Sequence, residues 1–359
     1  MRAVSLTVQI VAACMVSGAY IAGLGQSFGD ACGGAEADLK MLTHDLNRNA
    51  FENARSLVAR VRASHPDCQA LLLANARILA AVGEPSAAGR AFSQYADAMP
   101  DEATGMAYFA RFLIDQEQYA QADQFSAEAF DRAPDSPVTL AVRGQVLALK
   151  GQATQGRELL ERSCALDPDD AEAQFQLGTL FDRAKRPGDA VEHFRRVVEI
   201  DPSDGSAWDY LALNLEPLGR EEQADAAYIH GIAVNHQGQH YDAFLDYNYG
   251  RFLAKRNQFA DAKNHLDKAV EQVPDYRPPW FDRAKLDLIT RNYAQARSDG
   301  ERALSITDKT GGILNLQLYV LLEQVYRRLG EMELAGKYAE LIRQTPPPAR
   351  KDYGEPPPQ

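Results

Sequence analysis

The sequence predicts an all-α protein built from about nine helix–turn–helix units that follow one another along the chain. The first observation is a proline that recurs every 34 residues, at Pro66, Pro100, Pro134, Pro168 and Pro202. The second is a small residue that keeps the same interval, at Ala54, Ala88, Ala122, Gly156, Ala190 and Ala224. The third is the helical spacing of the apolar residues between these landmarks. Such a constant interval is hard to obtain by chance, so the chain is predicted to repeat one structural unit.

The clearest unit covers residues 171–204. Its first half places Leu177 and Phe181 one helical turn apart, and its second half repeats that step, so each half predicts an amphipathic helix. Between them, Lys185–Asp189 contains the proline and glycine that reverse the chain. Pro202 ends the second helix because proline lacks an N–H group and restricts the residue before it. The small and apolar residues that carry the pattern are Leu177, Gly178, Phe181, Ala190, Phe194 and Val197.

Counted from Ala171, these residues and Pro202 occupy positions 7, 8, 11, 20, 24, 27 and 32 of a 34-residue unit. This spacing resembles the tetratricopeptide repeat, a helix–turn–helix family. The resemblance implies a right-handed α-solenoid in which the first helix of every repeat lines a concave groove. It also implies a protein that binds other proteins or peptide segments rather than catalysing a reaction.

The pattern divides the chain into four parts. Residues 1–25 form a signal peptide or membrane anchor, 26–34 a linker, 35–349 the solenoid and 350–359 a proline-rich disordered tail. The register slips at Gln239–Asp242 and again at 311–315. The eighth unit departs from the pattern at Arg283, Asp287 and Asp308. The expected units are 35–68, 69–102, 103–136, 137–170, 171–204, 205–238, 243–276, 277–310 and 316–349.

The N-terminal segment places Arg2 before an uncharged, apolar run from Ala3 to Gly25, which indicates export and a bacterial envelope type of protein. Three fates stay open: an uncleaved anchor, which we prefer, cleavage after a small residue, or lipidation at Cys14 in the lipobox-like Val-Ala-Ala-Cys. A buried first helix is a fourth interpretation, but the run is too uniformly apolar for one stripe. Each of the first three places the rest of the chain outside the cytoplasm, in the periplasm or cell envelope.

Two cysteines flank the first unit. Cys32 lies just before its first helix and Cys68 just after its second, and these two ends of a helical hairpin lie side by side. A disulfide between them suits an oxidising compartment. The alternative is two free thiols. Cys164, on the second helix of its unit, is expected to be a small core residue.

The family resemblance assigns the concave groove to the first helices, and mapping by register selects residues for it. Aromatic rings beside Arg or Lys suit extended peptides, acidic tails or sugars, whereas the plainer interpretation is packing between repeats and solvated charges. We expect a partner to lie across the fifth to eighth units. The candidates are Phe175, Arg183, Tyr210, Tyr247, Arg251, Lys255, Phe281 and Lys285, and the earlier units offer Arg77, Tyr108 and Arg111.

Composition and motifs exclude several functions. A net charge of −12 argues against nucleic-acid binding. The sequence contains no C-x-x-C-H haem motif, no Walker A loop and no H-E-x-x-H zinc motif, so we expect no catalytic residue, cofactor or metal. The predicted function is a scaffold that holds peptide segments of an envelope assembly or secretion machine. The alternatives are an accessory subunit of an envelope enzyme complex, for polysaccharide or cytochrome maturation, and an enzyme with an unrecognised site.

Overall fold

The computed structural model describes residues 32–47, 50–99, 101–235, 241–307 and 313–345. The N-terminal segment 1–25, the lipidation candidate Cys14 and the tail 350–359 lie outside the described residues.

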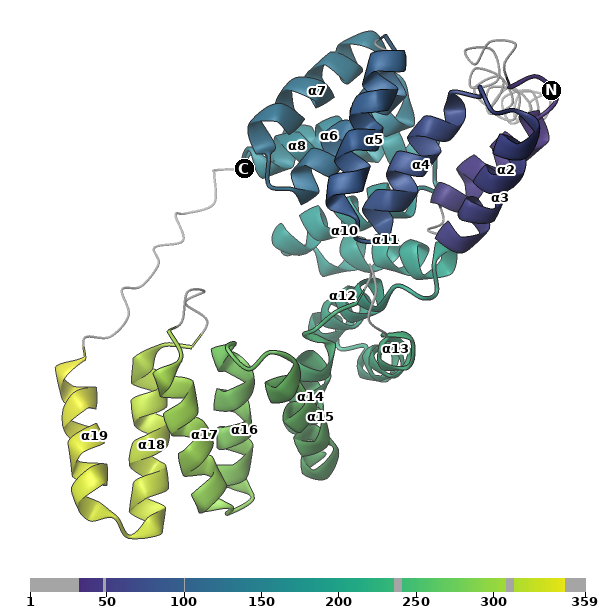
Figure 1. Ribbon diagram of the computed structural model, residues 1–359. Helices are drawn as coiled ribbons and strands as arrows, with labels where there is room; N and C mark the ends of the chain where they lie inside the picture. Colours follow the sequence, from purple (N-terminus) through teal and green to yellow (C-terminus); the bar gives the residue numbers. More distant parts are fainter. Residues whose placement is uncertain (1–31, 48–49, 100, 236–240, 308–312, 346–359) are drawn as a thin grey trace, which may run out of the picture. The chain divides into compact units, whose positions relative to one another are not determined.

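The predicted all-α fold is confirmed: the described residues form eighteen α-helices and one short 3₁₀ helix, η2 (Glu216–Leu218) (Figure 1). They pack in consecutive pairs from α2 with α3 to α18 with α19, and each pair is one helix–turn–helix unit. The helices are α2 (Glu36–Asn47), α3 (Phe51–Ser64), α4 (Ala70–Ala81), α5 (Pro85–Ala98), α6 (Ala103–Asp115), α7 (Tyr119–Arg132), α8 (Pro137–Leu149), α9 (Ala153–Leu166), α10 (Ala171–Arg183), α11 (Pro187–Ile200), α12 (Gly205–Leu215), α13 (Glu221–Val234), α14 (Leu245–Lys255), α15 (Phe259–Gln272), α16 (Arg277–Ile289), α17 (Tyr293–Ser305), α18 (Asn315–Leu329) and α19 (Met332–Gln344).

The chain divides into two compact units, which we call unit 1 (Met1–Tyr241) and unit 2 (Asp242–Gln359). Unit 1 contains α2 to α13, and unit 2 contains α14 to α19. Within unit 1 the first helices of neighbouring hairpins touch, α4 with α6, α6 with α8 and α8 with α10. Within unit 2 the same relation joins α14, α16 and α18. Each unit therefore has its own continuous row of first helices.

The recurring prolines end the second helices for the reason expected from the sequence. Helices α3, α9 and α11 each end two residues before Pro66, Pro168 or Pro202. The residue directly before each of these prolines has left the helical region, as at His65 (φ −136°, ψ 72°) and Asp201 (φ −126°, ψ 89°). A proline ring clashes with the preceding residue when that residue is helical, so the backbone adopts an extended conformation there.

Every described turn inside a hairpin of repeats two to nine has one residue with positive φ, at the fifteenth position of the repeat. An L-amino acid with a Cβ atom is strained there, whereas glycine is not. Glycine occupies half of these positions, at Gly83, Gly151, Gly219 and Gly330. The other half carry a side chain, at Glu117, Lys185, Asn257 and Arg291. The residue type therefore varies along this row while the backbone conformation stays constant.

The row of small residues allows the two helices of each hairpin to approach closely. Ala54, Ala88, Ala190 and Ala224 are completely buried. In the hairpin of α8 and α9, a Cβ atom placed on Gly144 would stand 2.7 Å from the carbonyl oxygen of the helix facing it. The backbones are therefore in near contact, and larger side chains fill the space on either side.

The first hairpin is closed covalently, because the structure links Cys32 and Cys68, whose Cα atoms are 4.9 Å apart. Both half-cystines are buried in one apolar cluster with Leu42, Val61 and Leu71. The outer face of this hairpin is polar, where Asp38 forms an exposed ion pair with Arg60. The disulfide therefore strengthens a terminal repeat that has a neighbour on one side only among the described helices.

Candidate binding surfaces on the first helices

In unit 2, four of the residues selected from the sequence act on one carboxylate, Asp282 of α16. The hydroxyl of Tyr247, on α14, donates a hydrogen bond to Asp282 Oδ2 at 2.9 Å. Burial raises the pKa of Asp282, while that hydrogen bond and the charges of Lys285, Arg251 and Lys255 act in the opposite direction. The charges of three cations thus act on one half-buried carboxylate. We call Tyr247, Arg251, Lys255, Asp282 and Lys285 the α14–α16 basic site.

An aromatic edge borders the α14–α16 basic site. The ring of Tyr247 meets Tyr276 edge-on at 6.0 Å, and Tyr276 meets Phe244 at 5.0 Å. Phe244 leaves 43% of its surface exposed, which is a large fraction for an apolar ring. Tyr247 is held from both sides, by a hydrogen bond and by a ring contact, so its hydroxyl has a fixed position. Sequence reasoning did not select Asp282, which lies three residues from Lys285 and has no distinctive pattern of its own.

Phe281 has a different role from its neighbours. It is half-buried and packs against the core cluster formed by Ala284, Ala296, Leu321 and Val325. Its ring supports the stacking of α16 on α17 and α18. The plainer interpretation from the sequence, packing between repeats, therefore describes Phe281 better than membership of a groove.

In unit 1, Phe175 and Tyr210 also pack between repeats. Their rings meet at 5.4 Å, and both contact the fully buried ring of Phe194, at 5.4 and 5.1 Å. Both side chains are half-buried. Arg183, in the last turn of α10, is exposed. The structure therefore joins the two rings in one cluster across α10 and α12, with Phe194 as its centre.

The three residues named for the earlier repeats stand together. The guanidinium of Arg77, on α4, lies 3.9 Å from the centre of the Tyr108 ring, and that of Arg111 lies 5.6 Å from it. Tyr108 is 7% exposed, and burial is the main reason that its pKa is raised. A neutral phenol ring therefore lies close to two guanidinium groups, one from each of two adjacent first helices.

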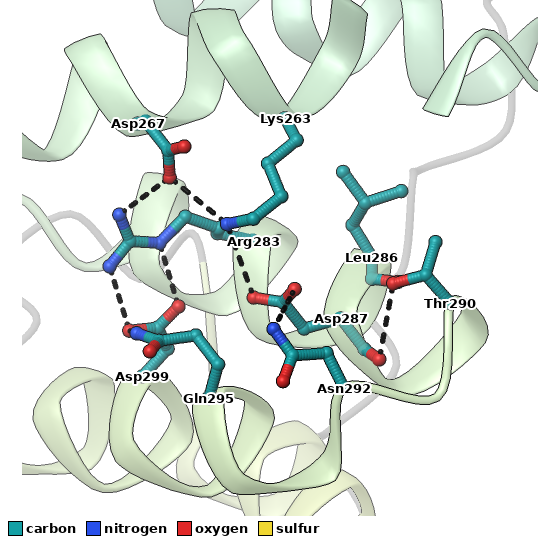
Figure 2. Close-up of polar contacts among 9 residues, drawn as sticks. All are labelled: Lys263, Asp267, Arg283, Leu286, Asp287, Thr290, Asn292, Gln295 and Asp299. Carbon is teal, nitrogen blue, oxygen red and sulfur yellow. Dashed lines mark hydrogen bonds and ion pairs between the residues drawn. The ribbon is translucent and has the colours of Figure 1, made fainter. Parts of the chain in front are cut away.

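A buried polar network in unit 2 explains why the eighth repeat departs from the apolar pattern (Figure 2). Arg283 and Asp287 occupy positions at which the fifth repeat has a leucine and a phenylalanine. Arg283 donates to both oxygens of Asp299 and, through Nη1, to Asp267 at 2.9 Å. Lys263 lies 3.6 Å from Asp287 Oδ2, and Asn292 donates to Asp287 Oδ1. These side chains hold α15, α16 and α17 together, so the departures at Arg283 and Asp287 are structural. The third departure, Asp308, lies outside the described residues.

Other kinds of site can be assessed for the described part of the chain. It contains no group of three or more His, Cys, Asp or Glu side chains placed to hold a metal ion. None of its helices combines the length and the hydropathy that a membrane span requires. Burial raises the pKa of the Cys164 thiol to about 12, so this cysteine is protonated at neutral pH and inert as a nucleophile.

Comparisons with known proteins agree with a fold of repeated helix–turn–helix units. Residues 142–205 match the family model described as tetratricopeptide repeat. The chain is 22% identical over 252 residues to the DnaJ homolog subfamily C member 7 homolog of Dictyostelium discoideum, covering 66% of this chain and 42% of that protein. It is 18% identical over 247 residues to anaphase-promoting complex subunit 3 of Schizosaccharomyces pombe, covering 69% of this chain and 36% of that protein. The chain thus spans less than half the length of these curated relatives.

Among solved structures, a chain of the APC/C hetero-tetramer Cut9–Hcn1 superposes with a TM-score of 0.67 at 13% sequence identity. The match covers 85% of the present chain and 58% of the other. At this identity the likeness concerns the fold, which is the same succession of paired helices.

Proposed function

Because the chain is built as a tetratricopeptide repeat protein, we propose that it is a non-catalytic scaffold that binds acidic peptide segments of partner proteins at the α14–α16 basic site. The observation that carries this proposal is that the charges of Arg251, Lys255 and Lys285, on two adjacent first helices, all act on one carboxylate, Asp282. These cations lie in a chain whose overall net charge is −12.

The chemistry of this site favours a carboxylate ligand. Lys255 and Lys285 are both exposed to solvent. Ionised groups form the stronger hydrogen bonds, and an incoming Asp or Glu side chain accepts from more than one of these cations. The exposed ring of Phe244 beside the site offers contact to an apolar neighbour in the same peptide.

A competition experiment with the full chain tests this proposal. The probe is a fluorescein-labelled peptide rich in Glu, and the matched probe has Gln at every Glu position. We expect the Glu peptide to bind more tightly, and the double variant Lys255→Ala/Lys285→Ala to weaken its binding about tenfold or more, equivalent to about 1.4 kcal/mol. Both lysines are exposed, so helicity measured by circular dichroism should stay unchanged.

Arg343→Ala is the matched control, because this exposed arginine of unit 2 is ion-paired only with its helical neighbour Glu340 among the described residues. It should bind the Glu peptide as the wild type does. Equal binding of the Glu and Gln peptides, or equal losses in the control and in the double variant, would refute an acidic-peptide site.

We further propose that the protein acts outside the cytoplasm, where its partners belong to an envelope assembly or secretion machine. Two features support this: the uncharged run after Arg2, and the disulfide between Cys32 and Cys68, a bond that persists in oxidising compartments. A reporter enzyme that is active only in the cytoplasm, fused after Gln359, should be silent. Full reporter activity would overturn the topology, and acyl labelling that is lost in Cys14→Ser would select lipidation over an anchor.

A further inference from the structure

A cavity of about 630 Å³ opens to solvent in unit 1, between α5 of the second repeat and the turn that joins α6 to α7 of the third. Sites for small molecules in proteins have volumes of about 300–1,000 Å³, so the cavity is of a suitable size for one. Most of its lining comes from a second helix and a turn. It is therefore distinct from the row of first helices that carries the α14–α16 basic site in the other unit.

The cavity exists because of one glycine. The twenty-first position of a repeat lies on its second helix, and its side chain usually contacts the repeat that follows. In the third repeat this residue is Asp123, which pairs with Arg143 of α8 at 2.7 Å, and in the fifth it is Val191, which is completely buried. In the second repeat it is Gly89, and a Cβ atom placed there would meet only the ring of Phe112, at 3.6 Å. The space that a side chain fills in other repeats is open here.

Four lining side chains offer hydrogen-bonding groups that the protein does not use. They are Arg90 and Gln94 on α5, and Gln116 and Gln118 in the turn. All four are exposed, and none of their side chains forms a hydrogen bond or ion pair with another part of the described chain. The backbone N–H groups of the two turn glutamines donate to carbonyl oxygens of α6, at 3.1 and 2.8 Å. The turn is therefore fixed, and the two carboxamides extend from a rigid backbone.

The chemistry of the lining favours an uncharged, polar ligand. Among the described residues the lining contains no Asp, Glu, His or Cys side chain, which are the usual ligands of metal cations. Its one charged group is Arg90. A carboxamide both donates and accepts hydrogen bonds, as a hydroxyl group does, so three carboxamides around one cavity match a ligand that carries several hydroxyl groups. The ring of Phe112 adds one aromatic surface for C–H groups.

We propose that this cavity, which we call the Gly89 cavity, binds a neutral mono- or disaccharide. The carboxamides of Gln94, Gln116 and Gln118 exchange hydrogen bonds with its hydroxyl groups. The guanidinium of Arg90 donates to a hydroxyl or ring oxygen, and the C–H groups of a sugar ring lie against Phe112. This function is additional to the binding of acidic peptides in unit 2 and does not depend on it.

The test measures saccharide binding to the full chain by saturation-transfer difference NMR, with maltose, cellobiose and N,N′-diacetylchitobiose as probes. We expect the wild type to bind at least one of the three. Gly89→Leu should weaken that binding about tenfold or more, because the added side chain fills the cavity. Gln116→Ala combined with Gln118→Ala should weaken it by a similar factor. Both glutamines are exposed, so the helicity of this double variant should equal that of the wild type.

Gly336→Leu is the matched control, since Gly336 occupies the same twenty-first position in the ninth repeat and has no atom within 4 Å of an added Cβ. It should bind the saccharide as the wild type does, and so should Lys255→Ala/Lys285→Ala. Gly89→Leu should in turn retain binding of the Glu peptide, which separates the two sites. Absence of binding to all three saccharides, or wild-type binding by Gly89→Leu, would overturn the proposal. If Gly89→Leu does not fold, the glutamine double variant decides, and wild-type binding by it would overturn the proposal equally.

Discussion

Arg283 and Asp299 form a two-pronged ion pair inside unit 2, with Nε to Oδ2 and Nη2 to Oδ1 both at 2.7 Å (Figure 2). Asp299 is 1% exposed and Arg283 is 9% exposed. The pair joins α16 to α17, and Gln295 donates a further hydrogen bond to the same carboxylate. The stability of the folded protein depends strongly on the presence of both partners, because either charge left alone in the core is poorly solvated.

Removal of one partner should therefore be far more harmful than removal of both. Arg283→Leu leaves the Asp299 carboxylate buried without its main partner, and we expect it to lower the free energy of unfolding by about 3–5 kcal/mol. Arg283→Met combined with Asp299→Leu should recover most of this loss. Arg302→Met is the control, since its partner Asp275 is 92% exposed and such pairs contribute about 1 kcal/mol or less. Urea unfolding gives all three values, and equal losses in Arg283→Leu and Arg302→Met would contradict the prediction.

The near contact of α8 and α9 should make Gly144 intolerant of alanine. The added Cβ would stand 2.7 Å from the Gly156 carbonyl oxygen, which belongs to the backbone and cannot swing aside. We expect Gly144→Ala to lower the free energy of unfolding by about 1–3 kcal/mol. Gly336→Ala provides the contrast: no atom lies within 4 Å of that position on α19, so alanine should stabilise by about 1 kcal/mol. The same sign of change at both positions would refute this account of helix packing.

The turn position with positive φ predicts a stabilising substitution. Lys185 has φ 59° and an exposed side chain, so Lys185→Gly removes backbone strain without loss of packing. After allowance for the greater freedom of glycine in the unfolded chain, we expect a gain of about 0.5–1 kcal/mol. Gly151→Ala should show the reverse, a loss of about 1 kcal/mol, since φ is 83° and no side-chain clash contributes. Thermal unfolding of both variants measures the effect. A lower unfolding midpoint for Lys185→Gly than for the wild type would contradict the prediction.

Asp115 should make the stability of unit 1 dependent on pH. Its pKa is raised to about 6 in the folded protein from a usual value near 3.8, so the folded state binds a proton more readily than the unfolded state. The carboxylate therefore destabilises the fold progressively as pH rises from about 4 through 6. Asp115→Asn should be more stable than the wild type at pH 7.5, and the difference should vanish below about pH 4. A difference that is constant across this range, measured by urea unfolding, would show that the carboxylate does not titrate as described.

The repeating interval determined most of the fold from the sequence alone. Helical period, a breaker at a constant position and a small residue at another are local properties, and each specifies the structure of its own repeat. The prolines therefore end the helices where expected, and the small residues are buried at each helix–helix contact. A given position in the repeat usually has the same structural role in each unit. The assignment of positions in one repeat therefore predicts their roles in the others.

Tertiary structure decided which side chains share a surface and what each of them does there. Asp282 has no distinguishing pattern in the sequence, and only the fold brings it under the influence of cations from two helices. Arg283 and Asp287 looked like defects in a pattern, because their partners come from α15 and α17 and no local rule connects them. Phe175, Tyr210 and Phe281 had the spacing of groove residues, yet packing between helices occupies them. Burial and pairing depend on distances between separate helices, and the spacing of residues within one helix gives no information about those distances.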